Sequence, residues 1–269
     1  MLDPLTKLLH DSAGHHGPLA LMYHSVQKIR GTPSWPWAVS LRQLEEHLDL
    51  LAREDWTTCT LSELSTQTGH TAKRRTVAIT FDDGFEDNLA ALEALVRRGM
   101  RASWFVVTGS IGNAPGWPDA GRPSGRILNG SELRTMVDLG MEVGSHGHTH
   151  SRLTSLTQAE IAEELTGSRK MLEDILGRRI LSFSYPYGDW DDRCEAAVSR
   201  AGYVTACTTR TGVAMRDANP LRIRRLTVFN HDKAPHLARK LALASNDGQW
   251  RSALKYVTGR ARTKLKSKG

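Results

Sequence analysis

The sequence has few cysteines, few aromatic residues and no long apolar run. Three cysteines lie far apart among 269 residues, at positions 59, 194 and 207. They match neither a disulfide framework nor a Cys-x-x-Cys zinc site, and Cys207, in an apolar stretch, is predicted to fill the core. No segment approaches the roughly 18 apolar residues of a membrane span. With 39% hydrophobic and 24% charged residues, the composition is that of a globular protein.

The start of the chain also lacks the pattern of a secretory signal. MLDPLTKLLHDSAGHHG carries an early aspartate and no apolar core of about seven or more residues. We therefore expect a cytoplasmic protein.

Acidic residues are absent from the end of the chain. Positions 250–269 hold seven lysines and arginines and no Asp or Glu, which equals the whole net charge of +7. Residues 1–249 are thus neutral overall. A basic tail of this kind can contact anionic lipid or can simply be solvated. The body has no basic stripe with interleaved aromatics, so nucleic acid is not expected as a partner.

Strand-like and helix-like segments alternate along the rest of the chain. Apolar, strand-like segments occupy 19–26, 75–81, 102–107, 141–146, 180–185, 203–209 and 223–229. Helix-like segments follow at 40–51, 88–98, 131–140, 157–176, 191–201 and 235–244, and a Gly- and Pro-rich loop is expected over 109–128. Ser40 with Gln43 and Thr157 with Glu160 have the spacing of capping boxes.

This alternation predicts an α/β fold with a parallel sheet and helices outside. About seven repeats in some 250 residues favour a closed barrel over an open sheet. We expect a single domain over residues 1–249, followed by the basic tail over 250–269.

Ionisable residues gather where the predicted strands end. The positions are His24, Asp82 with Asp83, His146 to His150, Tyr185 to Gly188, and Arg224 with Arg225. A barrel would bring them to one face. One aspartate and two histidines form a plausible ligand set for a divalent cation that keeps open positions.

Three of these motifs, in this order, resemble the NodB-homology polysaccharide deacetylases, which are carbohydrate esterase family four. They are TFDDG (80–84), HGHTH (146–150) and YPYG (185–188), and the resemblance covers roughly residues 19–228. It implies a distorted (β/α)7-type barrel and metal-dependent removal of acetyl groups from N-acetylhexosamines.

The resemblance also implies roles for individual residues. Asp83, His146 and His150 would hold the metal, most simply Zn²⁺, with Co²⁺ or Ni²⁺ as alternatives. Asp82 would be the catalytic base, and the backbone N–H of Tyr187 would stabilise the oxyanion. His148 lies between the ligands and is not expected to be one.

The sequence departs from the family's commonest pattern in two places. The third motif usually carries an arginine that orients the base, and here Ser184 stands in its place. Arg225 could supply that charge, with Arg224 as its competitor. In the family, a segment late in the chain usually holds the histidine that acts as the general acid, and this segment is absent from its usual place here. LMYHSV, near the start of the chain, is similar to that segment moved forward. Such a permutation resembles the poly-N-acetylglucosamine deacetylase branch and makes His24 the expected general acid, with His231 as the alternative.

The expected function is therefore removal of N-acetyl groups from a polysaccharide or a lipid-linked glycan precursor. Two other readings remain open: a deacylase that cleaves O-acetyl or other C–N bonds on the same fold, and a non-catalytic carbohydrate-binding relative. The basic tail could hold the protein at the inner face of an anionic membrane.

Overall fold

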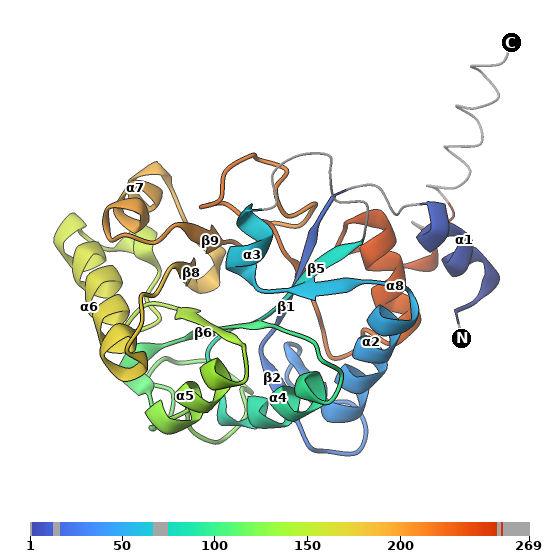
Figure 1. The fold of residues 1–269 in the computed structure, drawn as a ribbon, viewed down its shortest axis with the longest axis horizontal. Helices are drawn as coiled ribbons and strands as arrows, with labels where there is room; N and C mark the ends of the chain where they lie inside the picture. Colours follow the sequence, from blue (N-terminus) through green and yellow to red (C-terminus); the bar gives the residue numbers. More distant parts are fainter. Residues whose placement is uncertain (1, 13–16, 67–74, 252–253, 255–269) are drawn as a thin grey trace, which may run out of the picture.

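A curled sheet of parallel strands forms the centre of the computed structural model, which describes residues 2–12, 17–66, 75–251 and 254 (Figure 1). The strand order is β10-β1-β5-β6-β7-β8-β9, and β4 pairs with β5 beside this path. The strands are β1 (Leu19–Tyr23), β4 (Thr57–Cys59), β5 (Thr76–Phe81), β6 (Ser103–Val106), β7 (Glu142–Ser145), β8 (Ser182–Ser184), β9 (Thr205–Cys207) and β10 (Leu226–Thr227). A separate parallel pair is formed by β2 (Ser25–Gln27) and β3 (Ala38–Ser40).

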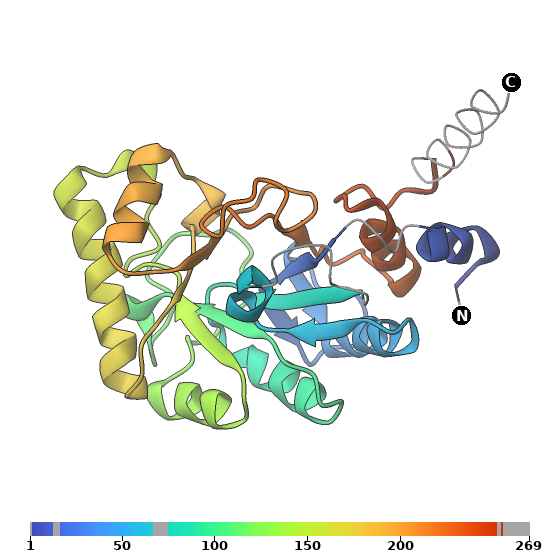
Figure 2. The same ribbon diagram turned by 45° about the horizontal axis from the view of Figure 1, so that its top comes forward.

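Helices lie on the outside of this sheet, as the alternating sequence pattern predicts (Figures 1 and 2). They are α1 (Pro4–Ser12), α2 (Leu41–Arg53), α3 (Leu61–Thr66), α4 (Leu89–Val96), α5 (Gly130–Asp138), α6 (Gln158–Leu176), α7 (Asp192–Arg200) and α8 (Ala234–Leu243). The central strands are buried along their whole length, since every residue of β1 and β5 is buried. This is the pattern of a parallel sheet that is covered on both faces.

The two edges of the sheet meet without a full strand pair. Cys207 in β9 forms an isolated parallel bridge with Ile223, three residues before β10. The N–H of Thr208 donates to the carbonyl of Ile223 at 2.9 Å. The predicted barrel is confirmed in its distorted form, but the strand expected over 223–229 shrinks to two residues. The N–H of Arg225 bonds the carbonyl of Arg210 at 2.9 Å, so between Ile223 and β10 the chain pairs with the loop after β9 instead of with a strand.

One of the two predicted capping boxes forms. Thr157 and Glu160 exchange both bonds at the start of α6. At α2, Ser40 Oγ accepts from the N–H of Gln43 at 3.2 Å, but the Gln43 side chain does not return the bond. It donates instead to the carbonyls of Asp232, at 2.8 Å, and Phe229, at 3.1 Å. The prediction for Gln43 was wrong because its side chain bonds these two distant carbonyls in place of the nearby backbone of Ser40.

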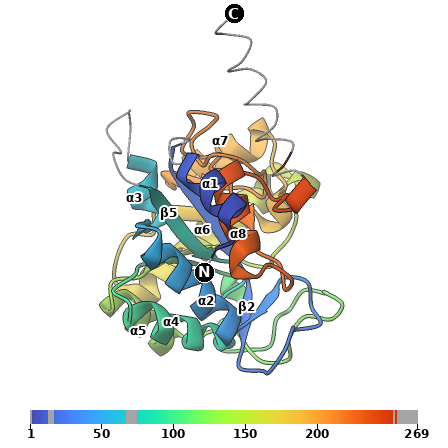
Figure 3. The ribbon, with the colours of Figure 1, turned by 90° about the vertical axis from the view of Figure 1, so that its right-hand side faces the viewer.

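The two ends of the described chain lie side by side, where α1 packs against α8 (Figure 3). Arg239 of α8 donates to Thr6 Oγ1 of α1 at 3.0 Å. All three cysteines are buried free thiols. Of the predicted tail, only residues 250, 251 and 254 are described, and the others lie outside the described residues. No helix in the described parts of the chain is long and apolar enough to cross a membrane.

Candidate active site

The strand-end residues picked out in the sequence meet at the carboxyl edge of the sheet. Most of them follow one of four strands: Asp82 and Asp83 come after β5, His146 after β7, Tyr187 after β8, and His24 after β1. Arg225 instead lies directly before β10. A cleft of about 640 Å³ opens at this edge. Its lining includes, among others, His24, Asp82, Asp83, His146, His150 and Tyr187.

One aspartate and two histidines converge at the bottom of the cleft. Asp83 Oδ1 lies 3.5 Å from His146 Nε2 and 3.4 Å from His150 Nε2. All three side chains are buried. His146 Nδ1 donates to the carbonyl of Ser184 at 2.8 Å, which leaves the Nε2 lone pair facing Asp83. Two imidazoles and one carboxylate at this spacing fit a divalent transition metal, and a fixed second ring nitrogen is typical of a metal-bound histidine.

The backbone is strained at the residues that approach this cluster. Asp83, His150 and Tyr187 have φ angles of 70°, 63° and 59°, in the left-handed region that non-glycine residues rarely adopt. Such conformations persist only where the surrounding structure enforces them, and they concentrate at functional sites. All three of these residues line the cleft.

Asp82 is held by a buried arginine. Arg225 Nη1 and Nη2 donate to its two carboxylate oxygens, each at 2.7 Å. Arg225 also donates to Thr80 Oγ1, Ser184 Oγ and the Thr208 carbonyl, each at 3.0 Å. The guanidinium therefore fixes the carboxylate through a bidentate pair and is itself fixed by three neighbours.

The charges around Asp82 decide its protonation. Burial by itself raises the pKa of Asp82, but Arg225 and His146 outweigh burial and hold this pKa well below its ordinary value. Burial lowers the pKa of His146 to about 4, so its ring is neutral and can act as a metal ligand. The site thus combines a neutral imidazole with an ionised carboxylate.

The structure separates the two candidate arginines. Arg224 turns away from the cleft and pairs with Asp217 at 2.8 Å. Arg225 occupies the space beside Asp82. The Ser184 hydroxyl bonds both residues, since it accepts from Arg225 and donates to Asp82 Oδ2 at 3.3 Å. A small residue at position 184 leaves room for the guanidinium that arrives from the other edge of the sheet.

The two candidate acid histidines are also separated. His24 is half-buried and lines the cleft, and its Nδ1 has no hydrogen-bond partner within the described chain. His231 has a side chain that is 60% exposed, it faces Asp232, and it does not contribute to the cleft lining. His148 bonds Thr108 Oγ1 at 3.0 Å and does not join the Asp83 cluster.

Sequence reasoning missed most of the aromatic side chains in the cleft. Trp35, Trp37 and Phe229 line it. Two tryptophans on nearby loops do not line the cleft: Trp117 is buried with its ring 4.6 Å from that of His150, and Trp190 packs under Arg222. The Trp-Pro-Trp stretch at 35–37 could have indicated Trp35 and Trp37, because it follows shortly after the strand-end histidine His24.

Comparison with known proteins gives matches along most of the chain. The family model described as polysaccharide deacetylase matches residues 69–206, a range that holds Asp82, Asp83, His146 and His150 but not His24 or Arg225. YxkH of Bacillus subtilis, assigned as a polysaccharide deacetylase, is 28% identical over 211 residues, which are 77% of this chain and 70% of that protein. The poly-beta-1,6-N-acetyl-D-glucosamine N-deacetylase of Staphylococcus aureus is 24% identical over 260 residues, covering 88% of this chain and 86% of that protein.

The fold also has relatives among solved structures. The Streptococcus pyogenes deacetylase PplD, solved in complex with acetate, superposes with a TM-score of 0.70 at 20% identity. The superposition covers 83% of this chain and 97% of that one. At this identity the likeness establishes the shared fold.

Proposed function

Because this chain belongs to the polysaccharide deacetylase family, we propose that it removes acetyl groups from N-acetylhexosamine units of a polysaccharide or a lipid-linked glycan precursor. One observation carries the proposal: the Asp83, His146 and His150 cluster and the ionised Asp82 share a single cleft. The Staphylococcus aureus relative, named as an N-deacetylase, supports a substrate of this class.

Asp83, His146 and His150 would hold the metal. We propose Zn²⁺, with Co²⁺ and Ni²⁺ as substitutes, since imidazole nitrogen suits all three. When bound, such an ion supplies Lewis-acid chemistry that favours a deprotonated water and polarises an acyl carbonyl. Asp83 contributes the negative charge of the ligand set, and the imidazole nitrogens of His146 and His150 complete it.

Asp82 is the proposed general base. Its ionised carboxylate accepts a proton from the attacking water, while Arg225 keeps both oxygens oriented. The N–H of Tyr187, presented by its left-handed backbone, is the proposed donor to the acetyl oxygen as that oxygen becomes negative. His24, across the cleft, then gives a proton to the departing amine.

The aromatic side chains of the cleft would bind the sugar. Trp37 is 38% exposed and its ring lies 5.5 Å from that of Trp35, which contacts the ring of His24 edge to face. Rings with one apolar face and a polar edge suit a sugar ring. We propose that these residues place the acetylated nitrogen between His24 and Asp82.

The test is acetate release from N-acetylglucosamine oligomers by chelator-treated protein, with and without added Zn²⁺, Co²⁺ or Ni²⁺. We expect release only with metal, and a fall of about 10²–10⁴-fold in kcat for Asp82→Asn and for His24→Ala. A parallel assay for new amines separates N-deacetylation from O-acetyl release. A protein that binds the oligomers without turnover under every metal, and binds them equally as Asp82→Asn, would be a carbohydrate-binding relative instead.

For location, we propose the inner face of a membrane, with positions 250–269 as the contact. Support comes from the seven cations of this segment, each of which contributes about 1 kcal/mol near an anionic surface. Removal of residues 250–269 is expected to abolish sedimentation with anionic vesicles while deacetylation of soluble oligomers continues. Equal sedimentation of both proteins would contradict the proposal.

A further inference from the structure

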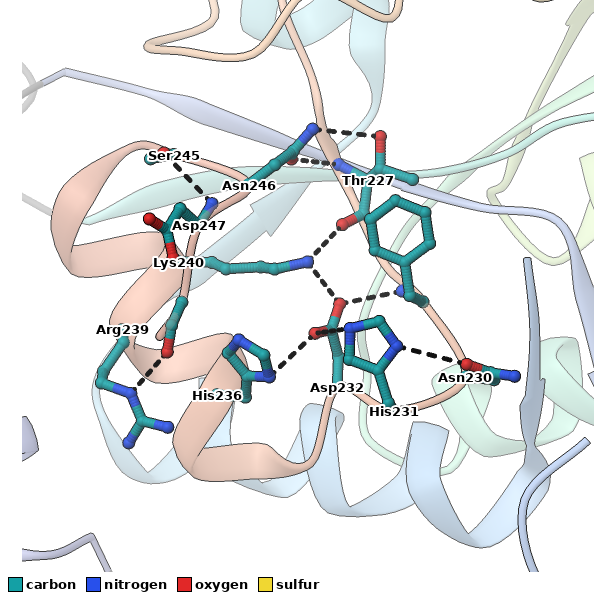
Figure 4. Close-up of polar contacts among 12 residues, drawn as sticks. Thr227, Asn230, His231, Asp232, His236, Arg239, Lys240, Ser245, Asn246 and Asp247 are labelled. Carbon is teal, nitrogen blue, oxygen red and sulfur yellow. Dashed lines mark hydrogen bonds and ion pairs between the residues drawn. The ribbon is translucent and has the colours of Figure 1, made fainter. Parts of the chain in front are cut away.

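A second cluster of side chains that could bind a metal lies at the start of α8 (Figure 4). It consists of His231, Asp232 and His236. Asp232 Oδ1 lies 3.7 Å from His231 Nε2 and 3.2 Å from His236 Nδ1. None of the three lines the cleft.

The Asp232 carboxylate has one satisfied oxygen and one without a donor. Oδ2 accepts from the N–H of Phe229 at 2.8 Å and from Lys240 Nζ. Oδ1 is buried, and no donor in the described chain forms a hydrogen bond with it. A buried carboxylate oxygen without a partner is costly, so its orientation toward two imidazoles calls for a positive centre between them.

The His231 ring is oriented as a metal ligand would be. Its Nδ1 lies 3.3 Å from Asn230 Oδ1, which can only accept, so the proton sits on Nδ1. Nε2 then presents a lone pair toward Asp232 Oδ1. Two acceptors that face each other repel unless a proton or a cation lies between them. A second ring nitrogen fixed by a hydrogen bond is the usual arrangement around a bound metal.

We propose that His231, Asp232 and His236 form a second cation site, which takes Zn²⁺ or a similar transition metal. Two ligands about 2 Å from one ion at a tetrahedral angle lie about 3.3 Å apart. The spacings here, 3.7 and 3.2 Å, are close to the 3.5 and 3.4 Å spacings around Asp83. Two imidazoles exclude Mg²⁺ and Ca²⁺ as the preferred ions, because both favour oxygen ligands.

The position of this site gives it a structural role. Phe229, which lines the cleft, stacks on His231 with ring centroids 5.6 Å apart and planes at 5°. The carbonyl of Asp232 accepts from Gln43 and from His47 of α2. A cation here would hold the loop before α8 against the first turn of α8 and so fix one wall of the cleft.

The experiment measures zinc bound per chain. The full chain is stripped with chelator and dialysed against buffered Zn²⁺ at a free concentration of about 1 µM, within reach of a three-ligand site. We expect two zinc ions per chain for the unmodified protein and one for His231→Ala and His236→Ala. Asp83→Asn should also bind one, and its combination with His231→Ala should bind none. Retention of two ions by His231→Ala, or a single ion in the unmodified protein that Asp83→Asn loses and His231→Ala keeps, would overturn the proposal.

Matched controls keep the result interpretable. Lys233→Ala changes an exposed residue of the same loop and should keep two ions. The His231 side chain is exposed, so its replacement by alanine should leave the fold intact. Asp232 is not substituted, because its Oδ2 accepts a hydrogen bond from the buried Lys240. Zinc should raise the Tm of Asp83→Asn by about 5 °C and leave that of Asp83→Asn/His231→Ala unchanged. An equal rise in both would also contradict the second site.

Discussion

At the scale of single residues, the pair of Asp82 and Arg225 dominates the electrostatics of the site. Both side chains are buried, and each carboxylate oxygen meets one guanidinium nitrogen at 2.7 Å. Two buried charges of this kind are stable only together, because loss of one partner leaves the other desolvated and unpaired. Arg225 therefore orients the carboxylate of Asp82, the proposed base, and also makes its burial tolerable.

We predict that Arg225→Met lowers the free energy of unfolding by about 3–5 kcal/mol, because it leaves Asp82 buried without a counter-charge. Urea unfolding measures the loss. Asp82→Asn in the same protein should restore part of it, since the uncompensated charge is then gone. Arg224→Met is the matched control. Arg224 pairs with Asp217 near the surface, so we expect this substitution to lower the free energy of unfolding by no more than about 1 kcal/mol. Equal losses at positions 224 and 225 would refute the argument.

At the scale of elements, the short 3₁₀ turn η4 (Pro186–Gly188) after β8 decides where the Tyr187 N–H points. Gly188 has a φ of 72°, and a Cβ added there would lie 2.0 Å from Thr209 Oγ1. The turn therefore needs glycine for its backbone angle and for the close approach of the neighbouring loop.

We predict that Gly188→Ala lowers kcat at least tenfold, because the turn must shift and carry the Tyr187 N–H out of position. Acetate release measures kcat, and thermal unfolding should show a lower Tm. Gly167→Ala is the control: this glycine is exposed within α6 and a Cβ there meets no atom within 4 Å. Alanine should stabilise that helix by about 0.5–1 kcal/mol and leave kcat unchanged. Full activity of Gly188→Ala would show that the turn does not position a catalytic group.

At the scale of the whole molecule, α2 is joined to the loop before α8 through a buried histidine. His47 Nε2 donates to the carbonyl of Asp232 at 2.5 Å, and its Nδ1 accepts from the Tyr23 hydroxyl at 3.0 Å. Burial lowers the pKa of His47 from 6.5 to about 4. The folded protein thus requires the neutral ring.

We predict that the folded state loses stability on acidification because of His47. Between pH 6.5 and 4 the unfolded chain binds a proton at this ring and the folded chain does not. The contribution of His47 to the free energy of unfolding is therefore fully present above pH 6.5. About 3 kcal/mol of it is lost as the pH falls to 4. Urea unfolding between pH 7.5 and 4 should show a shallower decline for His47→Gln, which can keep both hydrogen bonds without titrating. Parallel curves for the two proteins would contradict the assignment.

The sequence alone determined the features that depend on local order along the chain. Alternating apolar patterns predicted the parallel α/β sheet, and the strand-end motifs predicted that Asp82, Asp83, His146 and His150 meet at one edge, because the carboxyl ends of parallel strands share that edge. The Thr157 capping box followed equally from local spacing.

Only the tertiary structure decided the contacts between segments far apart in the sequence. It brought Arg225 to Asp82 across 143 positions and left Arg224 outside. It turned His24 into the cleft and His231 out of it, and it drew Gln43 away from its cap to the Asp232 carbonyl. The physical reason is the same in each case: neighbouring residues have equal local propensities, and the choice between them depends on which buried group needs a partner.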